Sequence, residues 1–322
     1  MTTPPAIRID NLVKEYASPG PGEPPKLALK GVSFDVPQGG IFGLLGPNGA
    51  GKSTTIRILM GLIHATSGSA EILGRPIKTM SHELRERIGY LPGEVNLYKN
   101  LSGKGTIRFV ARARGRQCEA YATELAKRLD LDLNIKVGKH SSGMKQKLGL
   151  ILALMHEPDL LILDEPTSAL DPLVKKTVFD LLHEFCQGER TVLFSSHSLN
   201  EVDELCDEVV ILRAGSIVEH QAIDRLKEKA VRRIRLEFTQ MKSTPQHSCF
   251  HLKNKKNREV AGSWTGSTVE LLKFIESANP DNFVVEPPDL EDLFLAYYSG
   301  DKGSISTEPS AEFSTPEEST ND

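Results

Sequence analysis

The 322-residue sequence lacks long apolar runs, paired cysteines and an excess of basic charge. These features are typical of membrane-spanning proteins, of disulfide- or metal-stabilised proteins and of nucleic-acid-binding proteins, respectively. No stretch approaches the roughly 18 consecutive apolar residues that span a bilayer. The N-terminus has neither the basic nor the apolar region of a signal peptide, which predicts a cytosolic protein. The four cysteines form no CxxC pair and sit near no histidine cluster at zinc spacing, which favours reduced thiols over disulfides or metal.

Charge is unevenly distributed along the chain. The net charge is −4, but residues 301–322 hold six acids and one lysine, so the remainder sits near +1. A nearly neutral body gives no electrostatic reason to expect nucleic acid as a ligand. The basic clusters at 227–235 and 253–258 are not interleaved with stacking aromatics, which favours solvated surfaces over a nucleic-acid site.

The order of apolar patterns predicts a doubly wound α/β fold. Continuous apolar runs are typical of strands buried on both faces of a parallel sheet, and they occur at 41–46, 159–166 and 191–196. Helical patterns follow from about 51 and at 173–185. Further strands are predicted at 6–16 and 27–36, around a loop rich in Pro and Gly at 18–25. Strands that alternate with helices indicate α/β architecture.

Changes in composition and in the pattern of apolar residues predict that the chain has three parts. Residues 1–220 would form the main domain, interrupted at about 95–157 by a helical subdomain without a convincing strand. Residues 221–300 pass from a charged helix into an alternating strand, and LEDLFLAYY closes the region near 298. They are predicted to form a small α+β accessory domain. The acidic tail at 301–322 has almost no apolar residues and is predicted to be disordered.

A phosphate-binding loop is predicted at 46–53, where GPNGAGKS matches the pattern GxxxxGK(S/T). A buried strand leads into it and a helix leaves it. Its glycines allow backbone N–H groups to point inward at the helix N-terminus, which suits polyphosphate. In P-loop proteins the lysine, here Lys52, reaches the β- and γ-phosphates and the hydroxyl of Ser53 ligates Mg²⁺. The alternative is a Gly-rich turn that only begins a helix.

Two adjacent acids end the apolar run at 159–165. Asp164 and Glu165 would be costly at the end of a buried strand unless something uses them. We expect Asp164 to bind Mg²⁺ directly or through water, and Glu165 to act as the base that polarises the attacking water. Taken alone, the segment could equally be a strand that ends in a solvated acidic turn before Pro166.

With these two sites in place, residues 6–220 resemble the nucleotide-binding subunit of an ATP-binding cassette (ABC) transporter. The family's motifs occur in order as GPNGAGKST at 46–54, SSGMKQKL at 141–148, LDEPTSALDP at 163–172 and SSH at 195–197. The fold implied is a P-loop NTPase cassette with a helical subdomain. GYLPGE at 89–94, the segment 141–172 and LEDLFLAYY are similar to the branch that serves bacterial multidrug and antibiotic exporters.

The resemblance implies a role for each matched residue. Tyr16 would stack on adenine, although a strand-end aromatic is an equal alternative. Ser141 and Gly143 would contact the γ-phosphate of ATP bound by a partner, Asp171 would couple the two sites, and His197 would orient the water. The residues expected to bind nucleotide are Tyr16, Gly46, Pro47, Asn48, Gly49, Ala50, Gly51, Lys52, Ser53, Thr54, Ser141, Gly143 and Asp171. Those expected to be catalytic are Glu165, His197 and Lys52, and those expected to bind metal are Ser53 and Asp164.

The sequence departs from the family pattern at two places. Ser142 replaces the first of two usual signature glycines, and we expect a modest weakening at most. Gly93 stands where the family's Q-loop glutamine normally touches Mg²⁺ and senses the membrane partner. Glu94 lies one position later, and we hypothesise that it substitutes, because an acid there could reach the metal through water.

The resemblance therefore implies a Mg²⁺-dependent ATPase that works as a homodimer or heterodimer. ATP-driven closure would move a substrate, by export, through separate transmembrane permease subunits that contact the helical subdomain and the 89–94 loop. The chain would be peripheral on the cytoplasmic face of the cell membrane. A soluble ABC-type ATPase acting on ribosomes, DNA or another protein is the alternative, disfavoured by one cassette and no sustained heptads. A regulatory module without turnover is opposed by Glu165 and His197.

Overall fold

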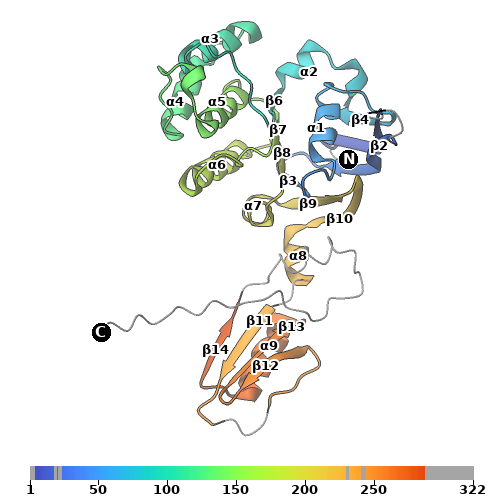
Figure 1. Ribbon diagram of the computed structural model, residues 1–322, viewed down its shortest axis with the longest axis vertical. Helices are drawn as coiled ribbons and strands as arrows, with labels where there is room; N and C mark the ends of the chain where they lie inside the picture. The colour runs from blue at the N-terminus through green and yellow to red at the C-terminus, as the bar shows by residue number, and fades with distance from the viewer. Residues whose placement is uncertain (1–3, 18–19, 21–23, 230–231, 241–243, 287–322) are drawn as a thin grey trace. The chain divides into compact units, whose positions relative to one another are not determined.

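The computed structural model describes residues 4–17, 20, 24–229, 232–240 and 244–286 (Figure 1). The LEDLFLAYY segment, the tail at 301–322 and most of the loop at 18–25 lie outside the described residues. The chain divides into two units, Met1–Arg225 and Leu226–Asp322, and each is described by itself. The boundary expected at 220 falls inside strand β10 (Ser216–Ala222), which pairs with β9 in the first unit.

The central sheet of the first unit has the strand order β10-β9-β3-β8-β7-β6. Five neighbouring strands run parallel and β10 is antiparallel at one edge. The five are β3 (Gly40–Leu45), β6 (Ile88–Leu91), β7 (Leu160–Asp164), β8 (Thr191–Ser196) and β9 (Glu208–Arg213). Every residue of β7 and β8 is buried, which explains the apolar runs Leu160–Leu163 and Val192–Phe194 within them.

Helices cover both faces of this sheet, as the α/β prediction requires. Figure 1 shows α5 and α6 on one side of it and α1 on the other. The helices that follow sheet strands are α1 (Lys52–Leu59), α6 (Pro172–Phe185) and α7 (Leu199–Leu205). The short α2 (His82–Glu86) precedes β6, and α8 (Ile223–Lys229) follows β10. Because β3, β7 and β8 run parallel, their carboxyl ends lie at the same edge of the sheet. Ligands bind at this edge in doubly wound folds.

A second, antiparallel sheet in the first unit has the order β2-β1-β4-β5. It consists of β1 (Ile7–Tyr16), β2 (Lys26–Val36), β4 (Ser67–Ile72) and β5 (Arg75–Pro76). The predicted strands at 6–16 and 27–36 pair here and not in the central sheet. Its inward side chains join one apolar core with Phe42 and Leu44 of β3 and Ile56 of α1. That core fixes β1 and β2 beside the loop that begins α1.

The region expected to be helical contains α3 (Gly103–Arg114), α4 (Glu119–Arg128) and α5 (Ser142–Leu154). Between residues 95 and 157, all of which are described, strand pairing is limited to one bridge, Ser102 with Lys136. Ser102 and Ser141 begin α3 and α5 by accepting a backbone N–H in the first turn. Among the helices of the described residues, none is long and apolar enough to cross a membrane.

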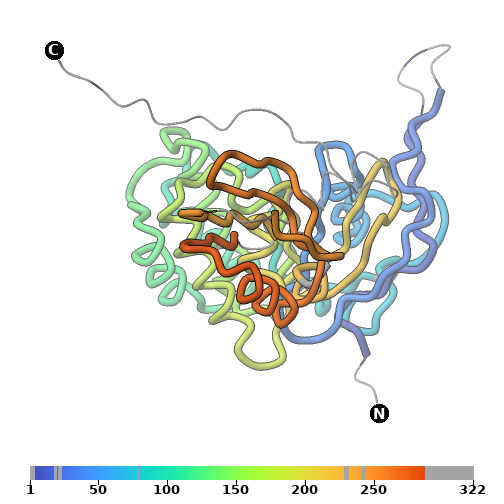
Figure 2. Tube along the Cα trace, turned by 90° about the horizontal axis from the view of Figure 1, so that it is seen from below, coloured from blue at the N-terminus to red at the C-terminus, as the bar shows by residue number. Residues whose placement is uncertain are grey.

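The second unit is a small α+β domain. Its antiparallel sheet has the order β12-β13-β11-β14. The strands are β11 (Arg232–Glu237), β12 (Phe250–Lys256), β13 (Glu259–Trp264) and β14 (Asn282–Val285), and the helix is α9 (Thr268–Ala278). Figure 2 shows α9 lying along these strands, where the rings of Trp264 and Phe274 stack with centroids 5.2 Å apart. This unit has its own apolar core.

Candidate nucleotide-binding site

The loop between β3 and α1 has the backbone that the GxxxxGK(S/T) pattern requires. Gly49 and Gly51 adopt φ values of 82° and 114°, which side chains on L-residues rarely allow. A Cβ on Gly51 would also lie 2.7 Å from Leu29 Cδ2, and one on Gly46 would lie 2.5 Å from a backbone oxygen of Leu212. The loop is therefore pressed against β2 and β9 so closely that only glycine fits.

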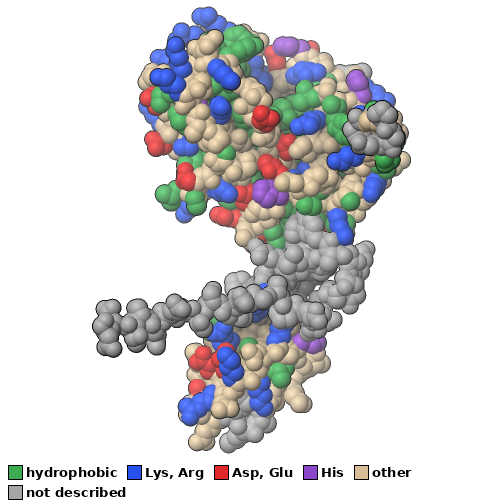
Figure 3. All heavy atoms as spheres, in the orientation of Figure 1, with side chains coloured by type: hydrophobic (Ala, Val, Ile, Leu, Met, Phe, Trp, Pro, Cys, Tyr) green, Lys and Arg blue, Asp and Glu red, His purple; other side chains and the backbone are tan. Residues whose placement is uncertain are grey.

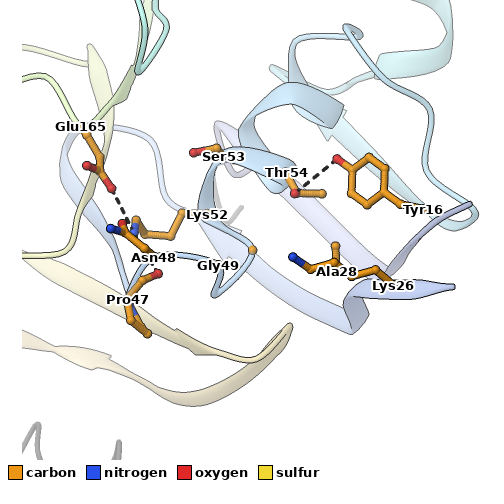
Figure 4. Close-up of a pocket in the computed structure, with 11 residues that line it drawn as sticks. Tyr16, Lys26, Ala28, Pro47, Asn48, Gly49, Lys52, Ser53, Thr54 and Glu165 are labelled. Carbon is orange, nitrogen blue, oxygen red and sulfur yellow. Dashed lines mark hydrogen bonds and ion pairs between the residues drawn. The ribbon is translucent and has the colours of Figure 1, made fainter. Parts of the chain in front are cut away.

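A pocket lies over this loop (Figure 4). Its lining residues are Tyr16, Lys26, Ala28, Pro47, Asn48, Gly49, Gly51, Lys52, Ser53, Thr54 and Glu165. Eight of the residues expected to bind nucleotide thus gather around one hollow, with Glu165 opposite. Ala50 is buried beneath the loop, and its backbone N–H donates to the carbonyl of Pro47. No sequence motif includes Lys26 and Ala28, which β2 brings to the pocket.

Lys52 is buried at the centre of the site, with 4% of its surface exposed. Its ammonium Nζ donates hydrogen bonds to the carbonyls of Gly46 at 2.6 Å and Pro47 at 3.3 Å. The same Nζ lies 3.2 Å from Glu165 Oε1. A buried charge needs such partners, and together they hold the ammonium over the loop, where phosphate oxygens would meet it.

Tyr16 ends β1 at the rim of the pocket. Its hydroxyl lies 3.5 Å from Thr54 Oγ1. Figure 4 marks this contact with a dashed line. The ammonium of Lys14 lies 5.1 Å from the centroid of the tyrosine ring, within the range of a cation–π contact. The structure thus places the ring beside the phosphate loop, and stacking on adenine stays a prediction.

Asp164 ends β7 directly below Ser53. Ser53 Oγ lies 3.1 Å from Asp164 Oδ1, and Ser195 Oγ donates to the same oxygen at 2.8 Å. Hydroxyl and carboxylate oxygens are the ligands that Mg²⁺ prefers, usually completed by phosphate and water. No group of three or more His, Cys, Asp or Glu side chains in the described ranges could hold a metal alone. A Mg²⁺ ion here would therefore depend on Ser53, Asp164 and the nucleotide.

Gly93 lies beside the second oxygen of Asp164. A Cβ on residue 93 would be 3.3 Å from Asp164 Oδ2. The loop that should touch the metal therefore does approach this carboxylate, but it brings a glycine there. The neighbouring Glu94 side chain is exposed, and its role as a substitute for the glutamine remains a hypothesis.

The carboxylate of Glu165 lies between two cationic or potentially cationic groups. Oε1 faces Lys52, and Oε2 lies 3.1 Å from His197 Nδ1. Glu165 and His197 follow the adjacent parallel strands β7 and β8, whose register brings Asp164 opposite Ser195. The three residues expected to be catalytic are thus brought together.

The backbone of Glu165 is held in an unusual conformation. Its φ of 49° lies in the left-handed region, which costs a residue with a side chain about 1–3 kcal/mol. Its N–H donates to the carbonyl and to the Oγ of Ser195 at 3.2 and 3.0 Å. Its carbonyl accepts from Gln146 Nε2 at 3.3 Å and from Ser168 Oγ at 3.1 Å. These contacts offset the strain and fix where the carboxylate points.

Ser141, Gly143 and Asp171 do not line the pocket. Ser141 Oγ accepts the N–H of Met144 at 3.2 Å and Asp171 Oδ1 accepts the N–H of Val174 at 3.0 Å, so both cap helices. A Cβ on Gly143 would be 2.8 Å from the carbonyl oxygen of Ala169. The start of α5 therefore packs on the segment between β7 and α6, apart from this chain's own phosphate loop.

Sequence reasoning missed the residues that support the two acids. Ser195 bridges Asp164 and Glu165, and it was noticed only as part of the SSH motif. Gln146 of α5 and Ser168 of the following loop hold the Glu165 carbonyl. Nothing in the sequence marked Gln146, which lies between Lys145 and Lys147, and only the fold shows that it is buried with 4% of its surface exposed.

Comparisons with known proteins agree with this geometry. The family model described as ABC transporter matches residues 29–168. The bacitracin transport ATP-binding protein BcrA of Bacillus licheniformis is 38% identical, covering 69% of this chain and 72% of BcrA. The Nod factor export ATP-binding protein I of Burkholderia orbicola (strain AU 1054) is 34% identical, covering 70% of this chain and 73% of that protein. A solved ATP-binding subunit of an ABC transporter is 29% identical, with a TM-score of 0.60, covering 69% of this chain and 92% of that one.

The family model covers β3, the phosphate loop, the start of α5 and the two acids at the end of β7. The comparisons give no support to a soluble ATPase that acts on ribosomes or DNA. The chain belongs to the ABC transporter family of ATP-binding proteins and is the ATPase subunit of such a transporter.

Proposed function

We propose that this chain hydrolyses Mg-ATP at a site shared with a second cassette and thereby drives export through separate transmembrane subunits. The observation that carries the proposal is the convergence of Lys52, Glu165 and His197 at the phosphate loop. Lys52 would bind the β- and γ-phosphates. Glu165 would orient and deprotonate the attacking water, and His197 would hold Glu165 and the γ-phosphate in place.

Ser53 and Asp164 would hold Mg²⁺ next to the phosphates. When bound, the ion would neutralise charge that develops on the phosphate oxygens. Ser195 donates to the same Asp164 oxygen that Ser53 contacts, which helps to hold this carboxylate in place. Tyr16 would bind the adenine ring at the far end of the pocket.

The positions of Ser141, Gly143 and Asp171 support a dimer. They are at helix starts outside the pocket, so we infer that they contact the γ-phosphate of ATP bound by a second chain. Members of this family work as dimers with transmembrane subunits, and a symmetric pair would bring each signature segment onto the partner's loop. ATP bound between two such surfaces would close the dimer, and hydrolysis would reopen it.

The helical subdomain offers the surface for the membrane subunit. Tyr98 and Phe109 are 65% and 50% exposed, and their rings contact each other edge to face with centroids 5.5 Å apart. Lys104, Arg108 and Arg112 are exposed on α3 around them. Figure 3 shows Lys and Arg side chains gathered over this part of the first unit. A cytoplasmic segment with apolar and acidic side chains would fit, and export is supported by the Nod factor relative's name.

The proposal is tested by co-purification. A Glu165→Gln chain is expressed, membranes are solubilised in mild detergent with Mg-ATP, and bound proteins are identified by mass spectrometry. We expect a stoichiometric protein with several membrane spans, lost with Phe109→Asp and retained with the control Val269→Asp, which alters an exposed apolar residue of α9. Recovery only with ribosomes, with nucleic acid or without a partner would contradict the proposal.

A further inference from the structure

The segments that carry Glu165 and His197 are joined by a carboxylate that does not touch the pocket. Glu201 lies on α7, and its side chain is 12% exposed. Oε1 accepts a hydrogen bond from Lys175 Nζ of α6 at 2.8 Å, and Oε2 accepts one from Ser196 Oγ at 2.7 Å. Thr167 also donates to this carboxylate. Three separate elements therefore meet at one side chain.

The Ser196 contact bears directly on His197. Ser196 Oγ donates to Glu201 and accepts the backbone N–H of Ser198 at 2.9 Å. The two residues that flank His197 are thus tied to each other and to Glu201. The imidazole can face Glu165 only while this short turn keeps its shape.

The Thr167 contact bears on the other side of the site. Thr167 is 1% exposed and lies two residues after Glu165 in the segment that leads to Asp171. Lys175 lies in the first turn of α6, which Asp171 caps. Burial alone would raise the pKa of Glu201, but hydrogen bonds from Lys175, Ser196 and Thr167 outweigh it, lower the pKa and keep the group ionised.

We propose that Glu201 is a positioning residue that holds the His197 turn and the Thr167–Asp171 segment in one arrangement, so that hydrolysis requires it while nucleotide binding does not. The inference rests on the catalytic roles proposed for Glu165 and His197. The plainer reading is that Glu201 favours α7 through its position in the first turn. That reading predicts an effect on stability but none that depends on His197.

The test uses the full chain and compares Glu201→Gln with Glu204→Gln, an exposed residue of the same helix. We expect Glu201→Gln to lower kcat roughly ten- to hundredfold, as small misplacements of catalytic groups do, with the Kd for Mg-ATP unchanged. Glu204→Gln should match the wild type. Activity of Glu201→Gln equal to that of Glu204→Gln would overturn the inference.

A double-mutant cycle separates positioning from general destabilisation. In a His197→Ala background, Glu201→Gln should lower kcat little further, because the imidazole that Glu201 is proposed to position is already absent. If the double variant loses kcat by the product of the two single-variant losses, Glu201 does not act through His197 and the inference is overturned.

A milder variant covers the case in which Glu201→Gln does not fold. Ser196→Ala leaves the Lys175–Glu201 pair intact and should still lower kcat without changing the Kd. Unchanged kcat in Ser196→Ala would overturn the inference. Wild-type turnover in Glu165→Gln would instead overturn the proposed function itself, so the two failures are distinguishable.

Discussion

Lys52 Nζ lies 3.2 Å from Glu165 Oε1, so the cation expected to bind phosphate is already paired with the carboxylate expected to activate water. A γ-phosphate would have to share the Lys52 ammonium with the Glu165 carboxylate. Glu165→Gln removes the negative charge of that carboxylate, so that Lys52 can pair with phosphate alone. We therefore expect hydrolysis to fall at least about a hundredfold, the scale of lost general-base catalysis, while Mg-ATP binds more tightly. Single-turnover hydrolysis and titration with a fluorescent ATP analogue would check this, and weaker binding would contradict it.

Nucleotide-dependent dimerisation follows from the same variant. With Mg-ATP, Glu165→Gln should elute as a dimer, since ATP is retained between the two cassettes. Adding Lys52→Ala should return it to the monomer, because phosphate is no longer held. Light scattering after size-exclusion chromatography measures both states. A Glu165→Gln chain that stays monomeric at saturating Mg-ATP would contradict the shared site.

Tyr16 separates base recognition from phosphate recognition. Its hydroxyl makes only a long contact with Thr54, so Tyr16→Phe should keep ATP affinity. Tyr16→Ala removes the ring and should weaken ATP binding by the equivalent of about 1–3 kcal/mol, the usual contribution of base–aromatic stacking. Binding of inorganic tripolyphosphate should not change. Equal losses for both ligands, measured by calorimetry, would mean that Tyr16 supports the loop and does not stack on adenine.

Glu94 tests whether the chain replaces its missing glutamine. If the carboxylate reaches Mg²⁺ through water, Glu94→Ala should raise the Mg²⁺ concentration needed for half-maximal ATPase activity several-fold. Glu124→Ala, which alters an exposed acid of α4 in the helical subdomain, is the matched control. An unchanged Mg²⁺ requirement and unchanged ATPase activity in the presence of the membrane partner would refute the substitution.

The phosphate loop offers a stability test with two similar glycines. Both Gly49 and Gly51 have positive φ, but a Cβ on Gly49 meets nothing within 4 Å, whereas one on Gly51 meets Leu29 at 2.7 Å. Gly49→Ala should cost about 1–2 kcal/mol from backbone strain, and Gly51→Ala about 1–3 kcal/mol more from overpacking. Urea unfolding followed by circular dichroism suits this comparison, because the single tryptophan, Trp264, reports on the second unit.

His156 should make folding stability depend on pH. Burial and the nearby Arg114 and Arg116 lower the pKa of His156 from 6.5 to about 4, although its ring hydrogen-bonds the Ile88 carbonyl. The unfolded chain therefore binds a proton between these values while the folded chain does not. Stability is fully present above about pH 6.5 and falls as pH drops toward 4, by roughly 3 kcal/mol in total.

Replacing His156 removes this dependence. His156→Gln should flatten the fall in unfolding free energy between pH 7 and 4.5, whatever its effect at pH 7. His183→Gln, which alters an exposed histidine of α6, should keep the wild-type slope. Identical slopes in the two variants would contradict the buried, neutral state of His156.

The parallel strands β3, β7 and β8 and the phosphate loop were predictable because their signals are local, whereas the parallel strands β6 and β9 were missed. Continuous apolar runs that end in Gly46 or Asp164 specify both a buried strand and the chemistry at its end. The partners of β1 and β2 were not predictable, because alternation of apolar residues shows which face is buried but not which strand lies alongside. The short strands at 67–72 and 75–76 carry too few apolar residues to be recognised alone.

The support around the acids was unpredictable for a related reason. Gln146, Ser195 and Glu201 lie far from Asp164 and Glu165 in sequence or carry no distinctive pattern, and only the register of β7 and β8 and the packing of α5 and α7 bring them together. Gly93 was noticed as a departure from the family pattern, but its proximity to Asp164 needed the fold.

The capping hydrogen bonds of Ser141 and Asp171 complicate the genetics of this protein. Alanine alleles at either position would remove a helix cap and lower folding stability by about 0.5–2 kcal/mol. Lower protein abundance and a lost intersubunit contact would then both appear as reduced transport. Asparagine can also cap a helix. Asparagine alleles that keep cellular protein levels normal but lose transport would therefore assign the defect to the dimer, and normal transport would assign these two side chains to folding alone.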